Sequence, residues 1–288
     1  MIGITRRHFL KNIALSTLAV SIPSINLLAR PQTKMKLGLV TYLWGKDWDV
    51  PTIIRNCEKS GVLGVELRTE HAHGVEPSLN ANQRKEVKKR FADSEVELVG
   101  YGGNEEFDSP DPAVLKKNIE RTKELIILMQ DVGGSGVKVK PNKFHEGVPK
   151  EKTLEQIGRS LNEVGKFAAE YDQQIRLEVH GEGTQELPNI KRIMDVADHP
   201  NVTVCWNSNP EDLHGKGLEY NFNLVKDRFG DTVHVRELNM NDYPYQKLMN
   251  LFNDIDYDGW ILLECRTDPE DKVKAMIEQR EVWKKMVS

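Results

Sequence analysis

From Gln32 onward, short apolar runs rich in β-branched residues alternate with windows in which apolar residues recur every three or four positions. The first pattern predicts buried strands, and the second predicts amphipathic helices. Eight strands are expected, at residues 36–42, 62–67, 95–101, 136–140, 174–179, 202–206, 232–238 and 260–265. Helices are expected between them, for example at residues 80–94, 113–132, 154–171, 186–197 and 272–286.

Strict strand–helix alternation with short connections predicts an α/β fold with a parallel sheet covered by helices. Eight such units on about 255 residues fit a closed (β/α)8 barrel better than an open sheet. We therefore expect a single barrel domain at residues 32–288, with no internal linker and no second domain. Residues 100–103 read Gly-Tyr-Gly-Gly, but no helix start and no ribose-binding acid follow. This glycine run therefore does not indicate a dinucleotide site.

The first thirty residues differ from all that follow. Residues 6–11 read Arg-Arg-His-Phe-Leu-Lys and precede an uncharged, mostly apolar run at residues 13–29. This arrangement is typical of a signal peptide and resembles a twin-arginine export signal. The apolar run is shorter than a membrane span of about 20 residues and is interrupted by Pro23. We expect residues 1–31 to be a cleaved signal, the protein to be periplasmic, and no stable membrane insertion to remain.

The composition and net charge limit the kinds of partner molecule that are expected. The net charge is −4, 39% of residues are hydrophobic and 29% are charged, as in ordinary soluble globular proteins. The chain lacks the basic stripe of a nucleic-acid-binding protein, so no nucleic-acid partner is expected. Three cysteines form neither a disulfide framework nor a paired metal motif. Assembly into a homo-oligomer stays open.

The chemistry is concentrated where the predicted strands end. Residues i and i+2 of a strand share one face, and a strand inside a barrel should be almost wholly apolar. Six predicted strands instead end in polar pairs at this spacing. The pairs are Glu66 with Arg68, Lys138 with Lys140, Glu178 with His180, Asn207 with Asn209, His234 with Arg236, and Glu264 with Arg266. Side chains at the carboxyl ends of barrel strands converge on one pocket, which is where barrel enzymes perform chemistry.

Residue types within this set indicate a metal site and an acid–base pair. Glu178, His234 and Glu264 offer the oxygen and nitrogen ligands of a divalent cation, and Asn207 would add its amide oxygen. Glu178 and Glu264 are also the catalytic candidates, because two carboxylates can exchange protons on the two faces of a substrate carbon. Each of these residues, taken singly, could instead form a purely structural salt bridge at the rim of the barrel.

A second group of polar and aromatic residues is expected to bind substrate. Cationic and imidazole groups would bind hydroxyls or stabilise an enediolate oxygen, and an aromatic ring suits the apolar face of a sugar. The substrate-binding candidates are Arg68, Lys138, Lys140, His180, Asn209, Arg236, Arg266, His73 and Trp44. Trp44 fits simple packing over the barrel end equally well.

Five of these segments, in this order, resemble the sugar phosphate isomerase/epimerase family. These xylose isomerase-like barrels also include ketose 3-epimerases, inosose dehydratases and endonuclease IV. The resemblance covers about residues 36–286. Its markers are Gly64-Val65-Glu66-Leu67-Arg68, Leu177-Glu178-Val179-His180, Val204-Cys205-Trp206-Asn207, Val233-His234-Val235, and Tyr257-Asp258-Gly259-Trp260 leading to Leu263-Glu264.

The resemblance implies one divalent metal held by Glu, Asp, His and Glu from strands five to eight. Glu178, His234 and Glu264 match three of these ligands, but Asn207 stands where the family has Asp. The loss of one negative charge implies that Mn²⁺, Mg²⁺, Co²⁺ or Zn²⁺ is held more weakly or not at all. In the family's epimerases the two glutamates also exchange protons with the substrate. The further ligands and the basic DNA-binding face of endonuclease IV are missing here.

Three functions are compatible with these residues. The first is a metal-dependent isomerase or epimerase that forms an enediolate on a small sugar or keto-sugar. The second is a lyase or dehydratase that performs β-elimination on a keto-sugar or 3-keto-glycoside, which export favours because glycosides are common outside the cytoplasm. The third is a non-catalytic carbohydrate-binding barrel. Only the first two predict exchange of a substrate C–H with solvent deuterium.

Overall fold

Eight parallel strands form the centre of the fold in the computed structural model, which describes residues 33–288. The predicted export signal at residues 1–31 lies outside the described residues. The strands pair in chain order, and β1 closes onto β8 to complete the barrel. Their bounds are β1 Lys36–Val40, β2 Gly64–Arg68, β3 Glu97–Glu106, β4 Gly136–Lys140, β5 Gln174–Glu178, β6 Val202–Asn207, β7 Phe229–Val235 and β8 Trp260–Leu263.

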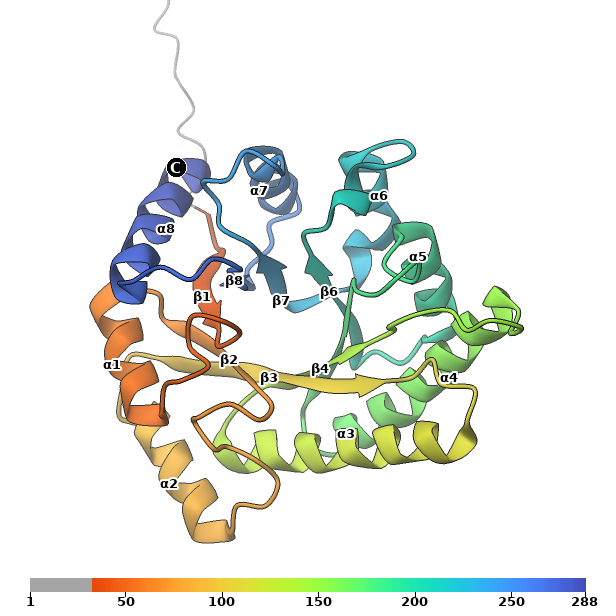
Figure 1. Ribbon diagram of the computed structural model, residues 1–288, viewed down its shortest axis with the longest axis horizontal. Coiled ribbons are helices and arrows are strands. Elements are labelled where there is room, and N and C mark those ends of the chain that lie inside the picture. Colours follow the sequence, from red (N-terminus) through yellow and green to blue (C-terminus); the bar gives the residue numbers. More distant parts are fainter. Residues whose placement is uncertain (1–32) are drawn as a thin grey trace, which may run out of the picture. The chain divides into compact units, whose positions relative to one another are not determined.

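Helices surround the strands in the same order (Figure 1). They are α1 Val50–Ser60, α2 Ala81–Ala92, α3 Pro112–Val132, α4 Lys150–Ala169, α5 Leu187–Val196, α6 Leu218–Val225, α7 Tyr245–Asp254 and α8 Lys272–Val287, with short 3₁₀ turns at Pro210–Leu213 and Lys226–Arg228. The predicted (β/α)8 barrel is therefore confirmed. Among residues 33–288, no helix is long and apolar enough to cross a membrane.

Local sequence explains where individual helices begin and end. The side chain of Asp49 accepts the Thr52 N–H at the start of α1, and Asp111 accepts the Ala113 N–H at the start of α3. An aspartate in this position satisfies a backbone donor that the helix leaves free. Gly133 ends α3 with φ of 90°, a left-handed conformation that glycine adopts without steric cost.

Strand β3 differs most from the prediction, because it continues to Glu106 rather than ending at residue 101. Glycine and asparagine at residues 102–104 are typical of loops. Here the backbone still pairs with its neighbours, since Gly102 lies opposite Arg68 of β2 and Glu106 lies opposite Lys140 of β4. In the pairing with β4 the register shifts between Gly102, opposite Lys138, and Glu106, so β3 carries extra residues over the barrel mouth.

Strand β7 begins at Phe229 and ends at Val235, whereas the sequence pattern predicts residues 232–238. The strand ends early because a residue after Val235 contacts the loop that follows β8. Glu237 is buried, and its Oε1 accepts the N–H groups of Arg266 and Thr267 in the loop after β8. This carboxylate therefore joins the loops that follow β7 and β8.

Inside the barrel, glycines on β3 and β4 make room for a large charged side chain from β5. A Cβ atom at Gly100 or Gly136 would lie 2.7 Å or 2.8 Å from the guanidinium of Arg176. Arg176 is fully buried, and it donates to Asp231 Oδ2 at 3.1 Å and to the Val99 carbonyl at 2.9 Å. Pairing of this kind is what permits a charge inside a protein.

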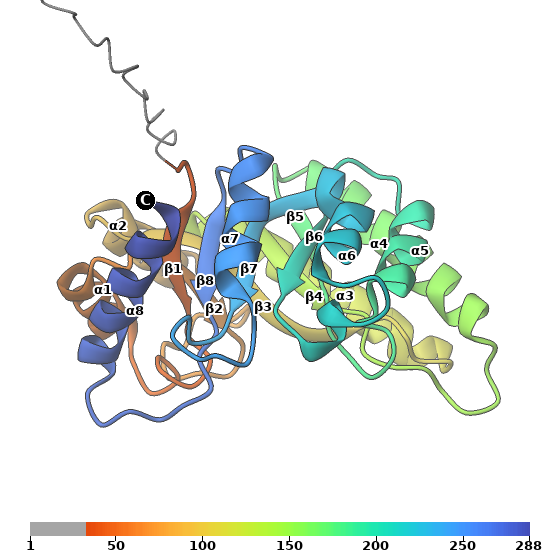
Figure 2. The ribbon, with the colours of Figure 1, turned by 90° about the horizontal axis from the view of Figure 1, so that it is seen from above.

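Outside the barrel wall, the aromatic rings of Trp206, Phe222, Phe229 and Phe252 pack against one another. Trp206 thus faces the helical layer, while its neighbour Asn207 faces inward. The loops after β7 and β8 lie on one side of the barrel (Figure 2). That side is the carboxyl end of the strands, where the polar residues gather.

Candidate active site

Three side chains from β5, β7 and the end of β8 meet at the carboxyl end of the barrel. Glu178, His234 and Glu264 are all buried, and one ligand atom from each lies within 4.8 Å of the others. His234 Nδ1 is 3.3 Å from Glu178 Oε1 and 3.8 Å from Glu264 Oε2. Ligand atoms bound about 2.0–2.2 Å from one ion lie about 3–4 Å from one another. The spacing therefore fits a shared divalent ion.

Glu178 is held on both of its oxygens. Lys138 Nζ lies 2.7 Å from Oε2, and Asn207 Nδ2 donates to Oε1 at 2.8 Å. Burial alone would raise the pKa of Glu178, but the Lys138 ammonium and His234 outweigh it and hold that pKa well below its usual range. Glu178 is therefore a carboxylate at neutral pH, which is the form that binds a cation.

His234 lies between carboxylates on both sides of its ring. Its Nδ1 faces Glu178 and Glu264, whereas its Nε2 lies 3.2 Å from Oε1 of the fully buried Glu66 on β2. Burial lowers the pKa of His234, but Cys205, Glu66 and Glu178 together raise it well above its ordinary value. A carboxylate behind the imidazole commonly fixes a metal-binding histidine, with the proton on the far nitrogen. Glu66 occupies that position.

A glycine on β3 creates the space for these long side chains. A Cβ atom at Gly102 would lie 2.7 Å from Arg68 Cδ and 2.8 Å from Glu66 Oε1. Any larger residue would push Glu66 or Arg68 out of place. Gly100 and Gly102 thus both make room for side chains inside the barrel.

Arg68 and Lys140 lie at the rim of the same mouth. Arg68 NH1 is 3.7 Å from Glu264 Oε1, and both cations approach Asn104 of β3. His180, two residues after Glu178, is half-buried, and burial lowers its pKa. Its imidazole is therefore neutral near pH 7, and it makes no hydrogen bond with another side chain in the part of the chain that the structure describes.

Several predicted substrate-binding residues instead contact the protein itself. The Asn209 amide donates to the Val179 and Asn207 carbonyls. His73 uses both ring nitrogens on backbone groups, at Arg68 and Val75.

The tryptophan and arginine candidates on the neighbouring loops form no hydrogen bond or ion pair with a proposed metal ligand among the described residues. Trp44 is 2% exposed, and its Nε1 donates to the Thr267 carbonyl. Arg266 is exposed at the rim. Arg236 is half-buried, and its Nε has no acceptor within the described residues. The candidates thus fall into two groups. Glu178, His234, Glu264 and the cations beside them lie together at the barrel mouth, and the others contact the surrounding loops.

Three residues that shape the site could not be given a role from the sequence. Glu66 was visible as a polar residue inside an apolar strand, but nothing in the sequence paired it with His234. Asn104 lay beyond the predicted end of β3, so its place over the mouth was not foreseeable. Glu237 fell at the end of a strand that was predicted too long, where an alternating pattern would have pointed it outward.

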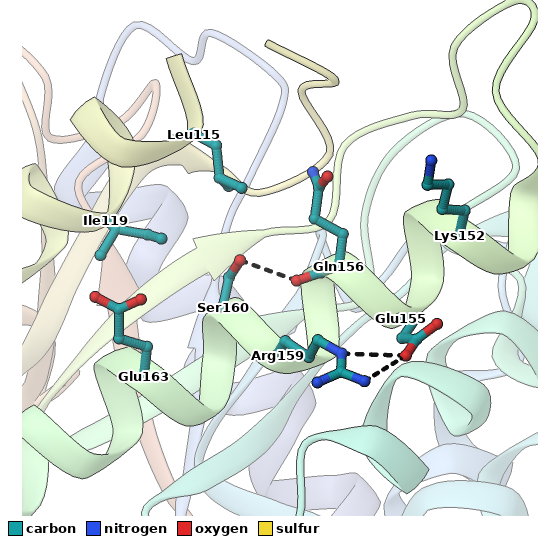
Figure 3. A pocket seen from close by; sticks show the side chains of 8 residues that line it. All are labelled: Leu115, Ile119, Lys152, Glu155, Gln156, Arg159, Ser160 and Glu163. Carbon is teal, nitrogen blue, oxygen red and sulfur yellow. Dashed lines mark hydrogen bonds and ion pairs between the residues drawn. The ribbon is translucent and has the colours of Figure 1, made fainter. Parts of the chain in front are cut away.

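A hollow of about 450 Å³ lies elsewhere, between α3 and α4 on the outer helical layer (Figure 3). Leu115 and Ile119 line one side of it, and side chains of α4 line the other. Arg159 pairs with Glu155 within α4, while Lys123 of α3 pairs with Glu163 of α4 across the gap between the two helices. This hollow has no share in the chemistry at the barrel mouth.

The chain was compared with known protein sequences and with solved structures. No curated protein sequence matches the chain. Among solved structures, 3-keto-D-glucoside 4-epimerase from E. coli is similar, with a TM-score of 0.74, 15% identity, and 87% of this chain and 99% of that chain covered.

Two further structures show the same fold. The IolI protein with a bound zinc atom has a TM-score of 0.72 and 16% identity, covering 88% of this chain and 98% of that one. A probable 3-DHS dehydratase from Bacillus anthracis has a TM-score of 0.67 and 16% identity, covering 87% and 99%. The model of the xylose isomerase-like TIM barrel family matches residues 54–286, and the chain therefore belongs to that family.

Proposed function

We propose that this barrel is a divalent-metal-dependent isomerase or epimerase of a small sugar or keto-sugar. The observation that carries the proposal is the convergence of Glu178 and Glu264 on His234 Nδ1 at the barrel mouth. The names of similar structures support the substrate class, since they include a 3-keto-D-glucoside 4-epimerase and an L-ribulose 3-epimerase.

The donor set fits a metal. Glu178, His234 and Glu264 would hold it, and Glu66 would keep the imidazole oriented. When bound, the ion supplies a Lewis acid that polarises a substrate carbonyl and an adjacent hydroxyl. Asn207 turns its N–H toward Glu178 and is therefore a partner of that ligand in this arrangement.

The protein's own groups then account for the proton transfers. Glu178 comes from β5 and Glu264 from the end of β8, so the two carboxylates approach a substrate from different sides. One removes the proton next to the carbonyl, and the other, in its protonated form, donates a proton to the opposite face of the same carbon. The Lys138 ammonium lies beside Glu178 and stabilises the negative charge that develops on the enediolate oxygen.

A lyase is the second candidate, and His180 is the observation that favours it. The half-buried imidazole is neutral and lies two residues from Glu178, at the same mouth. As a neutral base it would remove the proton next to the carbonyl, and the leaving group would take a proton from water as it departs, which gives β-elimination. One similar structure is a probable 3-DHS dehydratase.

The test is incubation with ketoses and 3-keto-glycosides in D₂O, with and without Mn²⁺, followed by mass spectrometry. The proposal expects one deuterium at the carbon next to the carbonyl and a new epimer or isomer, both only with metal. Release of an aglycone would show that the protein is a lyase and not an isomerase. Absence of deuterium with every compound, in wild type and Glu264→Gln alike, would leave the non-catalytic carbohydrate-binding barrel.

We also propose that residues 1–31 direct export, from the paired arginines Arg6 and Arg7 and the apolar run behind them. Replacing both arginines by lysine should leave the protein in the cytoplasm. Unchanged delivery to the periplasm would contradict the twin-arginine interpretation.

A further inference from the structure

Two cations from different strands converge on one neutral oxygen at the barrel mouth. Arg68 NH2 donates to Asn104 Oδ1 at 3.2 Å, and Lys140 Nζ donates to the same oxygen at 3.1 Å. Arg68 ends β2, Lys140 ends β4, and Asn104 lies on β3 between them. An amide oxygen carries no net charge, so it aligns the two cations without neutralising them.

Among the described residues, neither cation donates a hydrogen bond to a carboxylate. The nearest pairing of Arg68 is with Glu264, at 3.7 Å, which is longer than a hydrogen bond. No carboxylate oxygen within residues 33–288 lies within 4.0 Å of Lys140 Nζ. Glu106 lies opposite Lys140 on β3, but its Oε2 accepts from Asn142 instead. Arg68 Nε is also buried without an acceptor in that part of the chain.

The fold holds this pair of cations in place. Strand β3 shifts register between Gly102 and Glu106, and the extra residues carry Asn104 over the mouth. The Arg68 side chain is only 12% exposed, and its guanidinium lies 5.7 Å from the Tyr42 ring. Burial and the charges of Lys138 and Arg68 lower the pKa of Lys140. Like charges held this close are unfavourable until an anion joins them.

We propose that Arg68, Lys140 and Asn104 form a subsite for an anionic group of the substrate, either a carboxylate or a phosphate. A guanidinium and an ammonium with a fixed separation are the donors that bind such groups by charge-assisted hydrogen bonds. The Asn104 N–H₂ group supplies a further donor from the same side chain.

This subsite lies next to the proposed catalytic centre, so the inference rests on the proposed function and specifies its substrate. Arg68 reaches Glu264 with NH1 and Asn104 with NH2. One guanidinium therefore spans the distance between a proposed metal ligand and the anion subsite. A sugar acid or sugar phosphate of ordinary size can occupy both.

Binding of matched sugars tests the subsite directly. D-glucose, D-glucuronate and D-glucose 6-phosphate differ only in the group at C6, and their affinities can be compared by ligand-observed NMR with Mg²⁺ present. We expect one of the two anions to bind wild type at least about tenfold more tightly than glucose. Its identity distinguishes a carboxylate from a phosphate.

Variants separate the subsite from general electrostatics. Lys140→Met should remove the preference for the anion over glucose, and Lys140→Arg should restore most of it. Lys143→Met removes one exposed positive charge nearby and should leave the preference intact. Circular dichroism confirms that each variant is folded.

Equal affinity for all three sugars, or a preference that survives Lys140→Met, would overturn the anion subsite. These readouts are independent of catalysis. Anion preference without any solvent-deuterium exchange would contradict the proposed function while supporting the subsite. Efficient exchange with neutral keto-sugars alone would support the proposed function and contradict the subsite.

Discussion

Lys138 and Glu178 form an ion pair inside the barrel, with Nζ 2.7 Å from Oε2 and side chains 0% and 2% exposed. Such a pair is stabilising only while both partners remain, because either charge alone is costly to bury. Glu178 is also a proposed metal ligand. The Lys138 ammonium therefore has two effects. It stabilises the metal-free barrel, and it sets the charge around a carboxylate that is proposed to bind the metal.

Replacing Lys138 by methionine tests that link. We expect the metal-free variant to lose about 3–5 kcal/mol of unfolding free energy, because Glu178 then lacks its partner. Saturating Mn²⁺ should recover more stability in the variant than in wild type, since the ion supplies the missing charge. Urea denaturation with and without Mn²⁺ measures both effects. Lys140→Met is the control, and similar losses in the two variants would contradict the argument.

Glu66 offers a second test, because it contacts His234 from behind the proposed metal position. Glu66→Gln keeps the shape but removes the charge that orients the imidazole. Metal affinity should fall about 10–100-fold, as is usual when such a partner is lost. Calorimetric titration with Zn²⁺ measures it. Glu105→Gln changes another buried glutamate that does not contact His234, and an equal loss there would remove the special role of Glu66.

The barrel itself was predictable from the sequence because its signals are local. Each strand of the barrel is a short apolar run between helical windows, so order and closure followed from counting the units. The ends of β3 and β7 were not predictable. Gly102 and Asn104 have loop-like composition, and their pairing depends on strands that are distant in sequence. The early end of β7 depends on the contacts of Glu237 with the loop after β8.

The candidate site was predictable in its residue types and less so in its contacts. Polar residues two apart at strand ends indicated that Glu178, His234 and Glu264 share the mouth, because the strand period fixes which face they take. The pairing of Lys138 with Glu178 could not be predicted. Lys138 was expected to contact substrate, and only the three-dimensional register of β4 and β5 places it against the carboxylate.

Asn207 gives a third prediction, where this chain departs from the family pattern. Its N–H₂ group donates to Glu178 Oε1 at 2.8 Å. Asn207→Asp would set two carboxylates side by side, which favours an ion between them. We expect tighter Mn²⁺ binding with equal or lower turnover, because the added charge raises the pKa of Glu178. Calorimetry and an assay on one substrate measure both quantities. Unchanged Mn²⁺ affinity would show that this position does not reach the metal.

The raised pKa of the buried Asp212 carboxyl predicts how the free energy of unfolding depends on pH. Its Oδ2 accepts from Asn209 N and Tyr243 OH, and burial raises its pKa from 3.8 to about 7. The folded state therefore keeps a proton that the unfolded state has lost, so stability falls as pH rises from about 4 to about 7. A shift of about three units bounds the loss at about 4 kcal/mol.

Asp212→Asn should remove this slope, so that the variant gains stability relative to wild type between pH 5 and pH 8. Urea denaturation at several pH values measures the difference. Asp227→Asn changes an exposed aspartate and should follow the wild-type curve. Parallel curves for wild type and Asp212→Asn would show that Asp212 ionises normally in the folded protein.

The central claim is that Glu178, His234 and Glu264 hold one divalent ion, and bound metal measures it most directly. Purified protein is dialysed against Mn²⁺, Mg²⁺, Co²⁺ or Zn²⁺ and analysed by inductively coupled plasma mass spectrometry, beside a folded His234→Gln variant. The account predicts about one ion per chain for at least one metal in wild type, and less than about a tenth of that in the variant. Wild type without any bound metal, or a variant that binds as much as wild type, would contradict it.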